Sequence, residues 1–154
     1  GTAIVSFVGA GLLGLAHTLP GVNMYTHGTL VTAMHGHLAF WGAYGMIVLA
    51  FISYAMPNLT GRKLYDSNTG LLAFWLSNIG MVGMTVAFGV AGVAQVYLER
   101  KVGLEFGEVQ KEIQVHFVVL AACATLFTTG ICCYIYEFIK YGRPNNEALE
   151  TNIN

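Results

Sequence analysis

Four long apolar segments dominate this sequence, and polar stretches separate them. The segments cover residues 3–19, 30–55, 71–98 and 115–139, and a polar tail follows at residues 140–154. Hydrophobic residues make up 55% of the 154 residues and charged residues only 10%. An ordinary soluble domain has about 25% charged residues. Because so few charges cannot cover the surface of a soluble domain, we expect most of this surface to face lipid.

The length of the apolar segments predicts α-helices that cross a membrane. A spanning helix needs about 20 apolar residues, with a lower limit of about 17. The first segment, at 17 residues, just meets that limit. The alternation typical of strands does not stand out anywhere in the sequence, and helices satisfy all their backbone hydrogen bonds within lipid. We therefore expect an all-α integral membrane unit over residues 1–154, with four transmembrane helices.

The positions of Lys and Arg give the expected orientation. One side of the membrane would carry four basic residues and the other side three: Arg62, Lys63, Lys140 and Arg143 against Arg100, Lys101 and Lys111. Because positive charge favours the cytoplasmic side, this count favours a cytoplasmic C-terminus and an external loop at residues 20–29. The net charge of −1 and the scattered basic residues argue against nucleic-acid binding.

Two histidines, His35 and His37, lie inside the second apolar segment, in the stretch "TAMHGHLAFWGAY". A histidine in hydrocarbon requires partners for its ring nitrogens. Residues two apart on a helix are separated by about 200° of rotation, so the two rings point to nearly opposite sides and cannot chelate one ion together. This spacing suits a helix that stands between two planar cofactors and gives each an axial imidazole, as haem iron accepts. Two separate hydrogen bonds to neighbouring helices are the alternative.

Other polar residues gather just before this histidine pair. Thr29 is a predicted N-cap for the second apolar helix. His27 lies in the expected external loop, where it either contacts an anionic group such as a haem propionate or is an ordinary solvated histidine. His17 and Asn23 flank Pro20; they either belong to the same polar cap as His27 or have a structural role, and we favour the structural role.

The first segment contains a glycine pattern that is also found in dinucleotide-binding proteins. Gly9, Gly11 and Gly14 form G-x-G-x-x-G. That motif requires a following helix and an acidic residue about 20 positions further on, which holds the ribose. Here Pro20 cuts the helix short, and the first acidic residue is Asp66. We therefore expect these glycines to allow close packing between helices.

The stretch "HTLPGVNMYTHGTLVTAMHGHLAFWGAY", residues 17–44, resembles part of the catalytic large subunit, which is the cytochrome b component, of bacterial nitric oxide reductases. These enzymes are members of the haem-copper oxidase superfamily. The four-span layout is similar to the C-terminal third of that twelve-helix subunit. The resemblance implies a multi-pass protein of the bacterial inner membrane that reduces two nitric oxide molecules to nitrous oxide and water. Electrons would pass from a low-spin haem b to a centre of haem b3 and a non-haem iron.

The resemblance also implies roles for individual residues. His35 would be the catalytic residue and the axial ligand of haem b3, His37 an axial ligand of haem b, and His27 a neighbour of the haem propionates. The ligands of the non-haem iron would lie on helices outside this sequence. The implied partners are therefore the remaining N-terminal helices of the subunit, membrane lipid, and a cytochrome c subunit or a quinol as electron donor.

Three alternatives stay open at this point. The first is a related oxygen reductase or a nitric oxide dismutase, which is similar to the quinol-type reductase. A non-catalytic di-haem b electron-transfer subunit would have two protein ligands on each iron. In a haem-free helical membrane subunit, His35 and His37 would form hydrogen bonds between helices.

Overall fold

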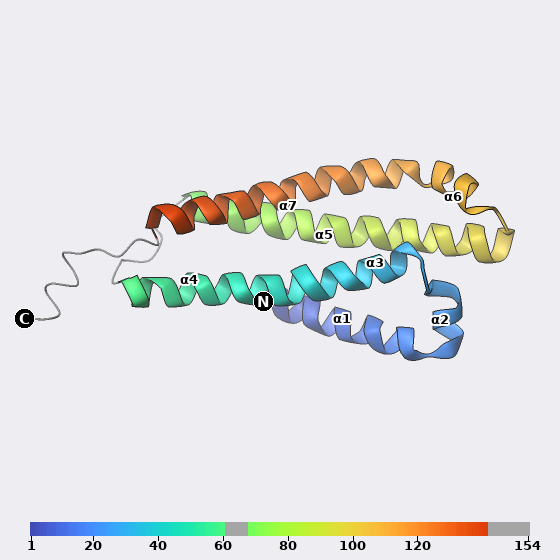
Figure 1. Cartoon of the computed structure of the whole chain (residues 1–154), viewed down its shortest axis with the longest axis horizontal. Coiled ribbons are helices and arrows are strands. Elements are labelled where there is room, and N and C mark those ends of the chain that lie inside the picture. The colour runs from blue at the N-terminus through green and yellow to red at the C-terminus, as the bar shows by residue number, and fades with distance from the viewer. Residues whose placement is uncertain (61–67, 142–154) are drawn as a thin grey trace, which may run out of the picture.

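The computed structural model describes residues 1–60 and 68–141 (Figure 1). Every regular element in these two ranges is a helix, and no strand occurs there, in agreement with the expected all-α class. Most of the expected polar tail lies outside the described residues, as do Arg62, Lys63 and Arg143 of the orientation count.

The chain begins with two helices that meet at a sharp bend. Helix α1 (Thr2–Thr18) and helix α2 (Pro20–Thr26) lie at 101° to each other. Between them Leu19 is extended, with φ −77° and ψ 121°. The expected loop at residues 20–29 is wrong for residues 20–26, because Pro20 ends one helix and begins the next. Proline lacks a backbone N–H, which the first turn of a helix does not need.

The second apolar segment forms one continuous helix in three parts. Helix α3 (Leu30–His37) passes into the π-helix η1 (Leu38–Gly45) and then into α4 (Met46–Thr60). The predicted N-cap is confirmed, because Thr29 Oγ1 accepts a hydrogen bond from the Val31 amide at 3.3 Å. The helix extends about one turn beyond the expected end near residue 55, and it includes Pro57.

Two long helices form the other half of the chain. Helix α5 (Asn68–Tyr97) continues into the π-helical turn η2 (Leu98–Val102), which ends at Gly103 with a positive φ of 82°. The short helix α6 (Phe106–Glu112) precedes α7 (Gln114–Tyr141). Within the described residues, three helices are long and apolar enough to cross a membrane, and the bent pair α1–α2 makes up to four. The chain is therefore a multi-pass membrane protein.

Small residues allow these helices to pack closely. Figure 1 shows α5 beside α7, and α1 beside the helix formed by α3 and α4. A Cβ at Gly80 of α5 would lie 2.5 Å from the Phe127 amide nitrogen of α7. A Cβ at Gly92 would lie 2.5 Å from the Val31 amide nitrogen of α3. Helix α5 therefore touches the backbone of both neighbours, as small residues permit in membrane helices.

The outer face of α5 is apolar and exposed. Four residues spaced at helical intervals on this face are each more than half exposed: Val82, Val86, Val90 and Val93. The opposite face buries Met81 and Met84 in a cluster with Met46 of α4 and Phe127 of α7. This distribution is the one expected of a helix with one face toward lipid.

Gly80→Ala tests the backbone contact between α5 and α7. Because the added methyl group would lie within 3 Å of backbone atoms of α7, the helices must separate. We expect the free energy of unfolding to fall by about 1–3 kcal/mol, as in other overpacked sites. The melting temperature of the detergent-solubilised protein would measure this loss. Gly11→Ala is the matched control, because a Cβ there meets nothing within 4 Å. An equal melting temperature for both variants would contradict the contact.

Candidate functional site

The histidine pair lies at the end of α3, directly before the π-helix η1. Both His35 and His37 belong to the last α-helical turn, and His37 is the residue that precedes η1. π-Helical turns are rare and occur frequently at functional sites. This position therefore singles out the pair independently of its residue type.

A side chain of α5 holds the first turn of α3, the histidine helix that carries His35 and His37. The side-chain oxygen of Gln95, which is only 3% exposed, accepts a hydrogen bond from the Leu30 amide at 2.9 Å. Its side-chain nitrogen donates to Glu99 Oε1, also at 2.9 Å. Because the first amides of a helix have no partner within that helix, Gln95 supplies one from a neighbouring span.

His37 faces α5, and its Nδ1 is already bonded. The ring centroid lies 4.6 Å from that of Phe88, and Nδ1 lies 2.9 Å from the Ala33 carbonyl oxygen. A carbonyl oxygen can only accept, so Nδ1 carries the proton in this hydrogen bond. The lone pair of Nε2 is then left for a ligand bond, as in metal-binding histidines whose other nitrogen is hydrogen-bonded.

His35 faces α1. Its ring centroid lies 5.5 Å from that of His17, with the two ring planes tilted by 57°. A Cβ at Gly14 would lie 3.2 Å from His35 Cε1 and 3.6 Å from its Nε2. The two histidines of the pair therefore face different helices, as the spacing of two residues predicts.

Polar atoms are buried between α1 and α3. His35 Nδ1 and both ring nitrogens of His17 are buried, and none of the three has a hydrogen-bond partner within the described parts of the chain. Buried polar atoms are nearly always hydrogen-bonded, so this arrangement needs an explanation. The ring of His17, for which the sequence favours a structural role, thus packs against that of His35.

His27 lies between α2 and α3 and is exposed. It is the residue at the end of α2, where its amide donates to the Asn23 carbonyl oxygen at 2.9 Å.

The sites could hold two cofactors, each through a single imidazole. The free Nε2 lone pair of His37 fits an axial ligand of haem iron. His35 has a buried Nδ1 without a partner among the described residues, so its Nε2 could bind a second cofactor while Nδ1 bonds an outer acceptor. Within residues 1–60 and 68–141, no three His, Cys, Asp or Glu side chains come together as a metal cluster.

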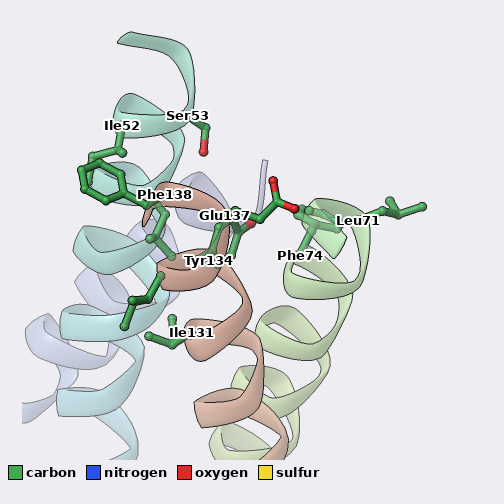
Figure 2. A pocket seen from close by; sticks show the side chains of 11 residues that line it. Ile52, Ser53, Leu71, Phe74, Ile131, Tyr134, Glu137 and Phe138 are labelled. Atoms are coloured by element: carbon green, nitrogen blue, oxygen red, sulfur yellow. The ribbon is translucent and has the colours of Figure 1, made fainter. Parts of the chain in front are cut away.

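A pocket of about 590 Å³ lies away from the histidines, where α4, α5 and α7 meet. Figure 2 shows Ser53 of α4, Phe74 of α5, and Tyr134 and Glu137 of α7 among its lining residues. Glu137 is only 3% exposed. It is not among the residues predicted from the sequence, although an acidic residue inside the apolar stretch "CCYIYEFI" is a signal for a functional position in a membrane helix.

Comparison with known proteins identifies the family. The family model for cytochrome c and quinol oxidase polypeptide I matches residues 1–126. The chain belongs to this family.

Individual relatives agree with this assignment. The chain is 40% identical over 151 residues to a nitric oxide reductase subunit of Stutzerimonas stutzeri, covering 93% of the chain and 32% of that protein. It is 27% identical over 146 residues to a probable cytochrome c oxidase subunit 1 of Bradyrhizobium diazoefficiens, covering 95% of the chain and 21% of that protein. The chain thus spans about a third or less of each of these two relatives.

The match to the polypeptide I family includes the whole histidine helix. Residues 1–126 contain α1, the pair His35 and His37, and all of α5. Membership of this family implies haem cofactors. The two histidines that face different helices are therefore the candidates for binding these cofactors.

Gln95→Leu tests how firmly the histidine helix is held. The change keeps the approximate size of the side chain but leaves the Leu30 amide without its bond from α5. We expect a loss of about 1–3 kcal/mol in the free energy of unfolding, because a partly buried donor is left unsatisfied. The melting temperature of the solubilised protein would report it. Gln114→Leu, at an exposed position of α7, is the control. If both variants melt alike, Gln95 does not hold α3.

Proposed function

We propose that this chain forms part of a membrane nitric oxide reductase. The observation that carries the proposal is the pair of histidines that face different helices, in a member of the polypeptide I family. The identity of 40% to a nitric oxide reductase subunit, against 27% to a cytochrome c oxidase subunit, favours nitric oxide over oxygen as substrate. The reaction would be 2 NO + 2 H⁺ + 2 e⁻ → N₂O + H₂O.

His37 would hold a low-spin haem b through its Nε2. Its bond to the Ala33 carbonyl oxygen keeps the proton on Nδ1, so Nε2 is the nitrogen that donates its lone pair to iron. The ring of Phe88 packs against the imidazole and restricts its rotation. The chain thus fixes both the tautomer and the orientation of this ligand.

His35 would hold haem b3 through its Nε2. Gly14 leaves space beside the imidazole that any larger side chain would fill. When bound, the haems and a non-haem iron would supply electron transfer and the reduction of nitric oxide. His27, at the exposed end of α2, would contact the haem propionates, because a histidine there can donate a hydrogen bond or carry positive charge.

The remaining parts of the centre would come from other helices. The non-haem iron and the second ligand of haem b would be supplied by N-terminal helices of the same subunit. A cytochrome c subunit or a quinol would donate electrons. The protein would lie in the bacterial inner membrane with its C-terminus in the cytoplasm, so that α2 and His27 are on the external side.

Optical spectra of histidine variants test these assignments in the complete membrane protein. We expect two b-type haems in the reduced-minus-oxidised spectrum, of which carbon monoxide shifts one. His35→Ala should remove the signal that carbon monoxide shifts and should abolish nitric oxide turnover. His37→Ala should remove the low-spin signal and stop electron entry. His116→Ala, in α7, is the control and should retain both signals.

Other spectra would contradict the proposal in distinct ways. Normal haem content in His35→Ala or His37→Ala would refute the assignment of that residue. Two haems that are both indifferent to carbon monoxide would indicate an electron-transfer subunit, and no haem would indicate hydrogen bonds between helices. Oxygen reduction without nitric oxide reduction would make the chain part of an oxygen reductase.

A further inference from the structure

His17 is a partly buried histidine to which the proposed function assigns no role. It lies in the last turn of α1, and both of its ring nitrogens are buried without a hydrogen-bond partner in the described residues. Leaving such groups unsatisfied is costly, particularly in a protein surrounded by lipid. A polar partner must therefore reach the His17 ring in the assembled protein.

His35 also has a buried ring nitrogen that lacks a hydrogen-bond partner among the described residues. His37 bonds its Nδ1 to the carbonyl oxygen four residues earlier, but the equivalent Nδ1 of His35 is buried and makes no hydrogen bond within the described residues. Histidines that bind a metal almost always donate their second ring N–H to an acceptor. The two rings of the pair thus differ in their outer partner, although they stand on the same helical turn.

The side chain of His17 is polar and packs against His35. The ring centroids are 5.5 Å apart, and the tilt of 57° turns the rings out of a parallel stack. Gly14, three residues before His17 on α1, brings the helix close to the same imidazole. Positions three apart lie on one helix face, so Gly14 and His17 together form the surface on which the His35 ring rests.

We propose that His17 is the positioning residue for His35, accepting a hydrogen bond from His35 Nδ1–H through one bridging water. A bridging water is a normal link between polar groups that are too far apart for direct contact. The proposal rests on the proposed function, in which His35 Nε2 binds haem b3. His17 does not touch the iron or the substrate, and it acts through the ligand.

An outer hydrogen bond of this kind sets three properties of the ligand. It keeps the proton on Nδ1, it holds the imidazole plane, and it raises the basicity of Nε2 toward iron. Loss of such a partner typically lowers metal affinity by roughly 10- to 100-fold. The bond between iron and His35 should therefore weaken without His17, whereas the site at His37 should not change.

The experiment compares His17→Phe with His17→Gln in the complete membrane protein. Phe keeps an aromatic ring against His35 but cannot form the hydrogen bond, whereas the Gln amide can accept and donate. The readouts are the iron–imidazole stretching frequency of the reduced high-spin haem, from resonance Raman spectra, and the retention of that haem on dilution in detergent. His116→Phe in α7 is the matched control for removing a histidine.

We expect His17→Phe to lower the stretching frequency and to weaken retention of the high-spin haem by roughly 10- to 100-fold. His17→Gln should restore most of both, and the low-spin haem of His37 should be unaffected in every variant. If Phe is too bulky for the protein to assemble, His17→Leu removes the hydrogen bond with a smaller side chain.

Failure of this inference can be told apart from failure of the proposed function. If His35→Ala retains its high-spin haem, His35 is not the ligand and both ideas fail. If His35→Ala loses that haem but His17→Phe leaves the stretching frequency unchanged, only the role of His17 is overturned. His35 Nδ1 would then have another acceptor, such as a backbone carbonyl oxygen of α1. A frequency that falls equally in the Phe and Gln variants would also overturn it, because ring packing alone would explain the effect.

Discussion

Direct contact between helix backbones is the constraint on which the rest of the structure depends. Helix α5 touches α7 at Gly80 and the start of α3 at Gly92. Helix α1 approaches η1 at Gly42, where a Cβ would lie 2.8 Å from Ser6 Oγ. Lipid chains are as apolar as the helices, so burial of apolar surface gives little drive for association, and close packing has to supply it. The positions of the histidine rings follow from these contacts.

The histidine helix is held on both sides by different means. On the α5 side, Gln95 holds the first turn of α3 and Phe88 packs against His37. On the α1 side, a glycine and a second histidine adjoin His35. The hydrogen bonds on the α5 side are made within this chain, whereas the α1 side leaves polar atoms whose partners are still to be identified. That difference assigns the two histidines distinct chemical environments despite their shared turn.

Much of this arrangement could be predicted from the sequence because lipid imposes strong rules. The apolar segments predict spanning helices, Thr29 predicts the start of α3, and the spacing of His35 and His37 predicts that they face different helices. The helix at Pro20–Thr26 could not be predicted, because proline signals both the end and the beginning of a helix. The contact of His17 with His35 depends on how α1 packs, and no local pattern encodes that packing. Glu137 could have been recognised from the sequence as a candidate functional residue, because it is an acidic residue within an apolar stretch.

The π-helix η1 alters the helical phase between the two halves of the second span. In a π-helix each backbone bond reaches five residues back, so each turn holds more residues than the 3.6 of an α-helix. A helical wheel drawn from His35 and His37 therefore loses its register at Leu38 and resumes with an offset at Met46. The faces of α3 and α4 are set independently as a result. The ligand-bearing end of this span can match its cofactors while the other end matches α5 and α7, within one unbroken helix.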